Sequence, residues 1–301
     1  MRIVVTGKVG QVVTALQAQA ARYDDIELIT LGRPDIDLAD LSSLEAPIKA
    51  ANPDVILSVA AYTAVDKAES EPELAQTING DAPGELARLA ASLNIPILHL
   101  STDYVFAGDK DEVYLETDPT GPVSVYGRTK LSGEDKIKAE TDNYVILRTA
   151  WVYSPYGNNF VKTMLRLGAS RDEVGVVSDQ LGCPTYAPEI ARALLAIARQ
   201  VVNDPDPILR GTFNLTGQGE TSWAGFAEAI FEEATDTLGR TVRVNAIPTS
   251  AYPTPAKRPA NSRLSGAKLD EVYGLQLDPW GVSLKTCLDE LTAVKTSEGA
   301  I

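Results

Sequence analysis

The sequence has few of the residues from which metal centres and nucleophilic triads are built: one histidine and two cysteines among 301 residues. A single histidine, His99, argues against a Ser–His–Asp triad and against a multi-histidine metal site. Its apolar sequence neighbours predict a core or second-layer residue. Cys183 and Cys287 lie far apart and lack a metal-ligand spacing. We therefore expect two free, buried thiols in a reducing compartment, and no bound metal.

Long apolar runs and excess positive charge are missing as well. No stretch approaches ~18 consecutive apolar residues, so no membrane span is expected. Residues 1–6 predict a strand rather than the parts of a secretory signal, and a cytoplasmic protein is expected. The chain has 27 basic and 41 acidic side chains, for a formal net charge of -14. Such a surface repels phosphate backbones, so nucleic acid is not an expected partner, and a phosphorylated ligand must be held locally.

Apolar runs of strand length alternate with helical patterns through the first half of the chain. With 44% hydrophobic residues, the chain can bury one large domain or two unequal ones. Buried strands are expected at Ile3–Thr6, Ile26–Leu31, Val55–Ala60, Ile95–Ser101 and Tyr144–Arg148. Helices are expected at Gln11–Ala21, Leu41–Ala51, Pro72–Leu93 and Tyr126–Glu140. The alternation predicts an α/β fold with a doubly wound, Rossmann-like parallel sheet.

The pattern loosens in the second half, where short strands and loops carry many of the 18 prolines. Residues 1–150 are expected to form a dinucleotide-binding Rossmann domain, to which residues 174–204 return. Residues 151–173 and 205–301 are expected to form a smaller, substrate-binding α/β region over the carboxyl edge of the sheet. The tail, Thr296–Ile301, is expected to fray. Further elements are expected at Asn159–Leu167 (helix), Val174–Val177 (strand) and Glu189–Val202 (helix).

The first predicted strand runs directly into the segment Gly7-Lys8-Val9-Gly10-Gln11, after which a helix begins. Gly7 and Gly10 would let the backbone approach a pyrophosphate, which the amides and partial positive charge of a helix N-terminus bind. The full dinucleotide pattern has a third glycine where this chain has Val13. That glycine mainly serves helix–strand packing, so the phosphate contact is expected to survive. Two glycines also occur in ordinary tight turns, but the N-terminal βαβ context favours a cofactor site.

The end of the second predicted strand bears on the choice between NADH and NADPH. An NAD-specific site usually has a carboxylate there, to accept hydrogen bonds from the ribose. Here Arg33 follows the strand, and Asp35 and Asp37 come slightly later. Arg33 would suit a 2′-phosphate, so NADPH is the expected cofactor, with NADH accepted too. The alternative for Arg33 is a solvated loop residue.

Three side chains of a catalytic kind then follow in order. Thr102 ends a predicted strand, at the edge where doubly wound sheets bind ligands. Tyr126 and Lys130 are spaced i, i+4, which places them on one face of the next helix. The Lys130 ammonium is expected to lower the pKa of Tyr126 from its reference near ~10, so that the phenol gives a proton to a carbonyl as hydride arrives. Each feature alone is common, but the ordered set is typical of short-chain dehydrogenase/reductase chemistry.

With these motifs the chain resembles the dTDP-4-dehydrorhamnose reductases, extended members of that superfamily, over nearly its whole length. The segments that carry the resemblance are Gly7–Gln11, Ala60–Asp66, Ser101–Phe106, Val125–Leu131, Arg148–Tyr153, Asn158–Phe160, Asp179–Thr185 and Arg258–Ser262. The last three are not general superfamily features and point to this family. The resemblance implies reduction of the 4-keto group of dTDP-4-dehydro-L-rhamnose, in the biosynthesis of dTDP-rhamnose for cell-surface polysaccharides such as the O-antigen of lipopolysaccharide.

The resemblance also implies roles for individual residues. At the pyrophosphate, Gly10, Gln11 and Val12 would contact the cofactor, in the loop that begins with Gly7. Asp37 and Leu38 would lie beside the adenosine. Ala61, Tyr62 and Thr63 would lie at the ribose and nicotinamide. Tyr126 would be the proton donor, and Lys130 its activator and a ribose ligand. The substrate contacts are Thr102, Asp103 and Trp151 at the sugar and Arg258 at the nucleotide diphosphate. For Arg258, a structural role in a proline-rich loop is the alternative.

Four positions depart from the pattern of this family, and none of them removes a catalytic group. Besides Val13, Ser58 stands where relatives often have asparagine near the end of the third strand. Asn214 stands where a later strand often has histidine. Some relatives dimerise through metal-bridged glutamates, one of them at the position of Ala15, so no such metal is expected here. The chain is expected to be a homodimer or a monomer.

Three other functions are considered at the level of sequence: two other enzymes of the same fold and one non-catalytic protein. A sugar-nucleotide dehydratase usually has Asp-Glu after the strand-end threonine, whereas this chain has Asp103-Tyr104, which disfavours elimination. An epimerase shares the tyrosine and lysine and is excluded less firmly. The third possibility is a non-catalytic protein like the regulatory subunit of methionine adenosyltransferase, which uses this fold to bind a partner. The intact Thr102, Tyr126 and Lys130 argue against lost catalysis, so a small-molecule nucleotide sugar is the expected partner.

Overall fold

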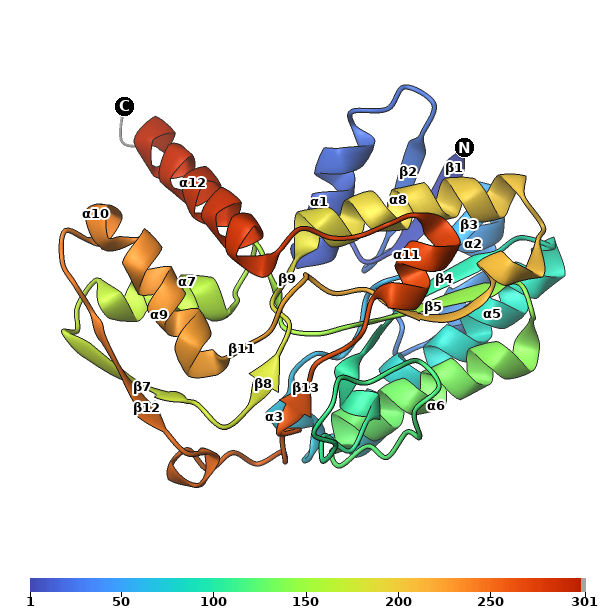
Figure 1. The fold of residues 1–301 in the computed structure, drawn as a ribbon. Coiled ribbons are helices and arrows are strands. Elements are labelled where there is room, and N and C mark those ends of the chain that lie inside the picture. The colour runs from blue at the N-terminus through green and yellow to red at the C-terminus, as the bar shows by residue number, and fades with distance from the viewer. Residues whose placement is uncertain (299–301) are drawn as a thin grey trace.

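The larger part of the molecule is built on a six-stranded parallel sheet (Figure 1), seen in a computed structural model that describes residues 1–298. The strands, in spatial order, are β10 (Gly211–Asn214), β5 (Tyr144–Thr149), β4 (Ile97–Thr102), β3 (Val55–Ser58), β1 (Arg2–Thr6) and β2 (Glu27–Leu31). Every neighbouring pair is parallel, so the carboxyl ends of all strands lie at one edge. The chain leaves β1 for β2 on one side and β3 on the other, which makes the gap above β1 and β3 the switch point of the sheet. The expected doubly wound α/β fold is confirmed.

Helices cover both faces of this sheet, and apolar residues of each layer form a separate core. One core joins strand residues such as Val5 and Leu147 to three helices, which are α1 (Gln11–Ala20), α8 (Ala187–Asn203) and α11 (Ala267–Tyr273). The other core joins the opposite face, with Val4 and Ile146, to a second group, which is α2 (Glu45–Ala51), α5 (Ala82–Leu93) and α6 (Val125–Glu140). The short elements on this side are η1 (Leu41–Ser43), α3 (Val65–Ala68), α4 (Pro72–Gln76), the π-helical η2 (Thr77–Asp81) and η3 (Asp103–Val105). The helices expected from the alternation lie in these two layers, together with α8 from the second half of the chain, whereas α11 was not expected from the sequence.

A smaller region lies beside the sheet and has an aromatic core of its own, around Tyr153, Phe226 and Phe231. Its helices are α7 (Phe160–Gly168), α9 (Trp223–Glu233), α10 (Thr235–Leu238) and α12 (Trp280–Glu298). Its strands are the parallel pair β7 (Glu173–Val177) and β12 (Arg243–Ile247), the trio β11 (Thr221–Ser222), β8 (Leu181–Gly182) and β13 (Asn261–Ser262), and the pair β6 (Val152–Tyr153) and β9 (Thr185–Tyr186). The remaining turns are η4 (Pro207–Leu209) and η5 (Thr249–Ala251). Figure 1 shows this region as a separate lobe, joined to the sheet through several chain crossings.

The chain crosses between the two parts more often than the expected boundaries allow. Within 174–204, β7 packs in the core of the smaller region and only α8 returns to the sheet. Within 205–301, β10 adds the sixth strand to the main sheet, and α11 covers it. Phe213 and Leu215 are fully buried there, but a run of four residues is too short for a sequence pattern to assign. Of the tail expected to fray, residues 296–298 end α12 and the rest lies outside the described residues.

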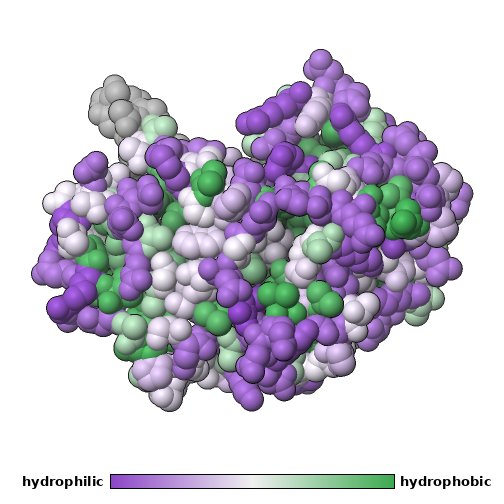
Figure 2. Space-filling view, in the orientation of Figure 1, coloured by the Kyte–Doolittle hydropathy of each residue, from purple (hydrophilic) through white to green (hydrophobic). Residues whose placement is uncertain are grey.

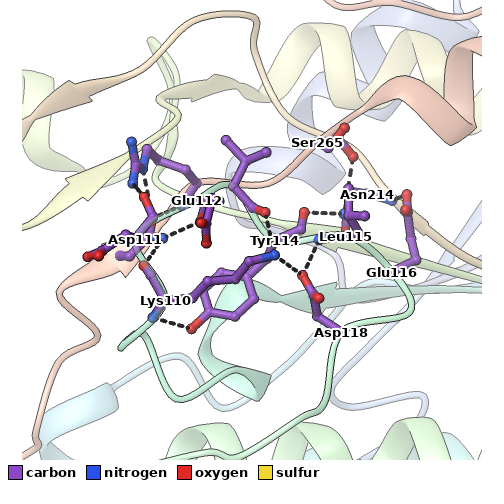
Figure 3. A network of polar contacts seen from close by, with 12 residues as sticks. Lys110, Asp111, Glu112, Tyr114, Leu115, Glu116, Asp118, Asn214 and Ser265 are labelled. Carbon is purple, nitrogen blue, oxygen red and sulfur yellow. Dashed lines mark hydrogen bonds and ion pairs between the residues drawn. The ribbon is translucent and has the colours of Figure 1, made fainter.

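The loop that follows β4 is tied to the C-terminal half by a polar network (Figure 3). The Tyr114 hydroxyl accepts hydrogen bonds from three consecutive backbone amides of the loop, at residues 108–110. The Asn214 amide nitrogen donates to the backbone carbonyls of Tyr114 and Ser265, and its backbone amide donates to Glu116. Asn214, one of the departures from the family pattern, is therefore a fully buried structural residue. It joins the end of β10 to two loops beside the sheet edge.

The described part of the chain has no helix long and apolar enough to cross a membrane. Within residues 1–298, no three His, Cys, Asp or Glu side chains are grouped in a way that could hold a metal ion. Cys183 and Cys287 are both free and buried.

Candidate active site

Two adjoining cavities lie at the carboxyl edge of the sheet, above the switch point. The first, the catalytic cavity, has a volume of about 540 Å³ and lies over β4 and the start of α6. The second, the adenosine-side cavity, has a volume of about 660 Å³ and lies over the end of β2. Both are lined by Val9, Ala61 and Thr63. Together they make one continuous groove of a size that suits an extended ligand with two ends.

Nearly all residues named from the sequence line this groove. Those in the catalytic cavity are Gly10, Gln11, Val12, Ala61, Thr63, Thr102, Asp103, Tyr126, Lys130 and Trp151. Those in the adenosine-side cavity are Gly7, Arg33, Asp37, Leu38, Ala61, Tyr62 and Thr63. Arg258 lines neither cavity. A further cavity of about 300 Å³, bordered by Cys183 and Asn214, contains none of the predicted catalytic, cofactor or substrate residues.

The glycine loop between β1 and α1 has the geometry that a bound phosphate requires. Gly7 and Gly10 have φ values of 101° and 122°, which side chains with a Cβ rarely adopt. No described side chain caps the N-terminus of α1, and its first turn contains no acidic residue. Val13, at the third glycine position, is buried in the core and its Cγ2 lies against Gly7. The helix therefore packs on the strand through Val13, while its uncapped amides face the cavity, where an anion binds well.

Gln11 has a second task that the sequence did not reveal. Its side-chain oxygen accepts hydrogen bonds from Ser154 and Asn159, at 2.8 and 3.0 Å. Its side-chain nitrogen donates to the carbonyl oxygen of Val152, at 3.3 Å. The amide group thus anchors the segment after β5 to the start of α1. Because the side chain is engaged within the protein, only the backbone of Gln11 is free to bind a ligand in the cavity.

The adenosine-side cavity has two cationic side chains at its rim. Arg33 is exposed and lines this cavity. Lys8, which sequence reasoning passed over, lines the same cavity, and its ammonium lies 2.6 Å from a carboxylate oxygen of Asp35. The side chain of Asp37 accepts a hydrogen bond from the backbone of Ala39. A ligand at this rim meets two basic and two acidic groups, and the balance between them sets its preference for phosphate.

The three catalytic candidates converge on the catalytic cavity. Thr102 is 5% exposed, and its hydroxyl donates to a carboxylate oxygen of Asp103, at 2.9 Å. The other oxygen of Asp103 is buried without a hydrogen bond among the described residues, although the Ser262 hydroxyl lies near enough to favour the charged form. Burial outweighs these contacts and raises the pKa of Asp103 to about 6. The site thus holds a carboxylate that is easily protonated beside Thr102.

The pKa of Tyr126 differs from the sequence expectation. Burial first, and then the charge of Asp103, raise the pKa of this phenol above its ordinary value, against a lowering contribution from the Thr102 hydroxyl. Burial also lowers the pKa of Lys130 to about 8, opposed by the charge of Glu134. Desolvation therefore dominates over the pairwise attraction that the i, i+4 spacing suggested. Tyr126 keeps its proton at neutral pH, as a proton donor must.

Trp151 lies in the wall of the catalytic cavity, and Arg258 lies behind that wall. Trp151, which follows β5, has the left-handed φ of 49° and lines the catalytic cavity. Arg258 forms an ion pair with Asp66, at 2.8 Å, and donates to the Tyr104 hydroxyl, at 3.2 Å. Tyr104 lines the catalytic cavity. Arg258 therefore lies one residue behind the wall of the cavity, held by a carboxylate, rather than in the wall itself.

Two buried polar residues that support the site were missed. The amide of Asn79, in η2, binds the backbone N–H and C=O of Tyr62, at 2.8 and 3.1 Å, and also donates to Thr129 on α6. Glu134, also on α6, accepts from Arg148 through both oxygens and from Ser101, at 2.6 to 2.9 Å. The sequence gives little signal for either, because a polar residue within a helical pattern ordinarily faces solvent.

A doubly wound sheet, an uncapped glycine-loop helix and a Thr–Tyr–Lys set in one groove define the class of protein. This is a dinucleotide-dependent oxidoreductase of the short-chain dehydrogenase/reductase type. Comparison with known proteins then gives the family. The chain belongs to the dTDP-4-dehydrorhamnose reductases: the family model described as RmlD substrate binding domain matches residues 1–293.

Individual relatives support this assignment across the whole chain. A dTDP-4-dehydrorhamnose reductase of Sinorhizobium fredii is 52% identical over 285 residues, covering 95% of this chain and 96% of the relative. The crystal structure of a dTDP-4-dehydrorhamnose reductase from Clostridium acetobutylicum has a TM-score of 0.89 at 39% identity, covering 97% of this chain and 100% of that one. The enzyme of Bacillus anthracis, solved in complex with NADP, has a TM-score of 0.88 at 33% identity, covering 96% and 99%. The resemblance expected from the sequence is confirmed.

Proposed function

We propose that this chain reduces the 4-keto group of dTDP-4-dehydro-L-rhamnose to give dTDP-L-rhamnose, with NADPH as the hydride donor. The observation that carries the proposal is the convergence of Thr102, Tyr126 and Lys130 on a cavity that continues into the glycine loop. The names of the relatives supply the substrate. The reaction belongs to the biosynthesis of dTDP-rhamnose, and the free, buried cysteines fit a cytoplasmic, reducing setting.

The residues of the groove fit NADPH by their own chemistry. The uncapped N-terminus of α1 suits the pyrophosphate, and a Cβ at Gly10 would meet nothing within 4 Å among the described atoms, so the backbone is open to a close approach. Lys8 and Arg33 at the rim of the adenosine-side cavity suit a 2′-phosphate. NADPH supplies the hydride when bound. The bound NADP of the Bacillus anthracis relative supports the same choice.

The catalytic residues then have distinct tasks. Tyr126 holds a proton on its hydroxyl, because burial and Asp103 raise its pKa, and gives it to the ketone oxygen as that oxygen gains charge. The Thr102 hydroxyl donates its single proton to Asp103, at 2.9 Å, and rotation of this hydroxyl would turn the proton to the ketone oxygen and orient it. Lys130 lines the same cavity as Tyr126, and its positive charge favours the phenolate after proton transfer. Trp151 and the smaller region exclude water from the sugar side.

We infer that the two ligands bind to different parts of the molecule. We assign the cofactor to the larger, sheet-containing lobe and the nucleotide sugar to the gap between it and the smaller one. The placement of Trp151, and of Arg258 beyond Tyr104, supports this assignment, since both come from segments that lead into the smaller region.

The direct test is turnover of purified protein with dTDP-4-dehydro-L-rhamnose and NADPH. Loss of NADPH absorbance with formation of dTDP-L-rhamnose, identified by NMR, is the expected result, with slower turnover on NADH. The protein should exchange its cofactor and carry little of it after dialysis. Stoichiometric NAD that survives dialysis, with interconversion of sugar epimers and no net oxidation of NADPH, would replace this function by that of an epimerase.

A further inference from the structure

Lys130 is held from behind by two acceptors. Its Nζ lies 2.8 Å from the backbone oxygen of Leu100 and 3.1 Å from Nε2 of His99, both on β4. Lys130 is 2% exposed and His99 is 1% exposed, so water does not compete for these contacts. An ammonium group has three N–H donors. Two of them are therefore engaged on the strand side, which leaves the third for the catalytic cavity that Lys130 lines together with Tyr126.

The contact with Lys130 also fixes the protonation of the imidazole. A lysine ammonium only donates, so Nε2 of His99 must accept and carry no proton. The proton of the neutral ring then sits on Nδ1, which lies 3.0 Å from the Ser58 hydroxyl oxygen on β3. Burial, and then the charge of Lys130, hold the pKa of His99 well below its usual range, so the ring stays neutral. Ser58, His99 and Lys130 thus form a chain with one consistent direction of donors.

We propose that His99, whose Nδ1–H is held by the Ser58 hydroxyl, is a positioning residue that directs the Lys130 ammonium at Tyr126 and the cofactor ribose. This inference rests on the proposed reductase function and adds to it two residues outside the Thr–Tyr–Lys set. Neither His99 nor Ser58 lines the catalytic cavity. Both act through Lys130, whose direction would otherwise depend on a single carbonyl oxygen.

The surrounding charges do not supply this direction by other means. Glu134, one turn further along α6, stabilises the charged form of Lys130, but its carboxylate is engaged by Arg148 from β5 and by Ser101 from β4. Asp103, after β4, acts on Tyr126. Within the described chain, His99 is therefore the side chain that binds the ammonium directly.

The first test uses the fact that the chain has one histidine. Selective ¹⁵N-histidine labelling of the intact protein gives one pair of ring signals, without any need for turnover. The expected spectrum is that of a neutral ring protonated on Nδ1 that does not titrate between pH 5.5 and 8, a window set around the reference pKa of about 6.5. Lys130→Met should shift the Nε2 signal. An Nε2-protonated ring, or titration at the ordinary pKa, overturns the proposal.

The second test follows the pH profile of kcat. The hydrogen bond to His99 favours the charged form of Lys130, so its removal in His99→Phe should move the basic limb to lower pH and reduce kcat about 10- to 100-fold. His99→Gln can offer an amide oxygen to Lys130, so it should restore much of kcat and of the position of the basic limb. Ser58→Ala should also move the basic limb to lower pH, but by a smaller amount than His99→Phe. Ser58→Thr keeps the hydroxyl and should leave the basic limb in place.

The outcomes separate the two proposals. If wild-type protein does not oxidise NADPH with the sugar nucleotide, the proposed function fails, whereas the ¹⁵N spectrum still reports on His99. If wild-type protein turns over and folded His99→Phe keeps the pH profile and kcat of the wild type, the reductase function stands and the positioning role falls. If His99→Phe does not fold, the comparison of Ser58→Ala with Ser58→Thr decides instead. Equal pH profiles of kcat for these two variants overturn the proposal.

Discussion

Trp223 lies flat against Trp151, with ring centroids 3.6 Å apart and an interplanar angle of 11°. Trp151 lines the catalytic cavity, while Trp223 is the first residue of α9 in the smaller region. Gly182, on β8, lies so close that a Cβ there would collide with the indole of Trp151. These contacts hold Trp151 in its left-handed backbone conformation. The smaller region thus sets the position of a cavity wall through one indole.

Gly182→Ala should displace the Trp151 indole and weaken binding of the nucleotide sugar. The expected result is a KM for the sugar nucleotide raised on the order of tenfold, since overpacking costs about 1–3 kcal/mol, with the Kd of NADPH unchanged. Gly281→Ala is the matched control, because a Cβ at Gly281 meets nothing within 4 Å. Steady-state kinetics with tryptophan fluorescence measure both effects. An unchanged KM, or equal effects of the two alanines, would show that Trp151 does not contact the sugar.

Tyr126→Phe should abolish nearly all turnover while cofactor binding persists. The ring and its edge-on contact with Tyr104, at 5.4 Å between centroids, remain, and only the proton donor is lost. The expected decrease in kcat is on the order of 10²–10⁴-fold, as for loss of a general acid. Tyr23→Phe, at a partly exposed position far along the chain from the site, should keep full activity. A Tyr126→Phe variant with near-normal kcat would refute the assignment of the proton donor.

Local patterns in the sequence were sufficient to predict the glycine loop, the strand-end Thr102 and the i, i+4 pair of Tyr126 and Lys130. Each of these is a short run whose chemistry follows from its position in a βαβ unit. The contacts of Glu134 with Arg148 and of Lys130 with His99 are different, because they join residues 14 and 31 positions apart. Such partners are brought together by packing, which no single stretch of sequence encodes. The order of the pKa effects at Tyr126 likewise depends on burial, which appears only in three dimensions.

Glu134→Gln should strongly destabilise the fold. Burial alone would raise the pKa of Glu134, but the hydrogen bonds and charge of Arg148 outweigh it and keep the pKa below its ordinary value. Removal of this charge leaves the buried guanidinium of Arg148 without its counter-charge, at a cost of about 3–5 kcal/mol. Chemical denaturation at neutral pH measures this loss in the free energy of unfolding. Lys285→Ala, which removes an exposed i, i+4 pair with Asp289, should change stability by less than about 0.5 kcal/mol. Comparable losses in the two variants would contradict the burial argument.

Asp103→Asn should stabilise the protein at pH 8 and leave its stability nearly unchanged below pH 4. The pKa of Asp103 is raised from 3.8 to about 6 by burial, so between these values the native state binds more protons than the unfolded state. The free energy of unfolding of the wild type therefore falls as the pH rises through this window and is constant above it. The total loss that Asp103 contributes is at most about 3 kcal/mol. Asparagine keeps an oxygen for the Thr102 hydroxyl and carries no charge. Melting temperatures of both proteins across this range should diverge from about pH 4 to pH 6; parallel curves would show that Asp103 titrates normally.

The ion pair of Arg258 and Asp66 distinguishes the two roles considered for Arg258. The guanidinium is 27% exposed and the carboxylate 40% exposed, and Asp66 also accepts from the backbone of Ala256. The pair therefore fastens the loop before β13 to α3, which is the structural role. A guanidinium that is only partly engaged can also turn one edge to a diphosphate. The same residue thus has a carboxylate competing with the proposed ligand.

Substitution of each partner in turn separates these roles. Arg258→Ala should raise the KM for the sugar nucleotide about 10- to 100-fold, because a charge-assisted contact is lost, and leave kcat and the Kd of NADPH nearly unchanged. Asp66→Asn removes the competing charge but keeps the hydrogen-bonding shape, so KM should stay equal or fall. Lys257→Ala, at the exposed neighbouring position, controls for a general loss of positive charge. If Arg258 only fastens the loop, Asp66→Asn and Arg258→Ala should raise KM together. If Arg258→Ala weakens NADPH instead, the cofactor and substrate have been assigned to the wrong lobes.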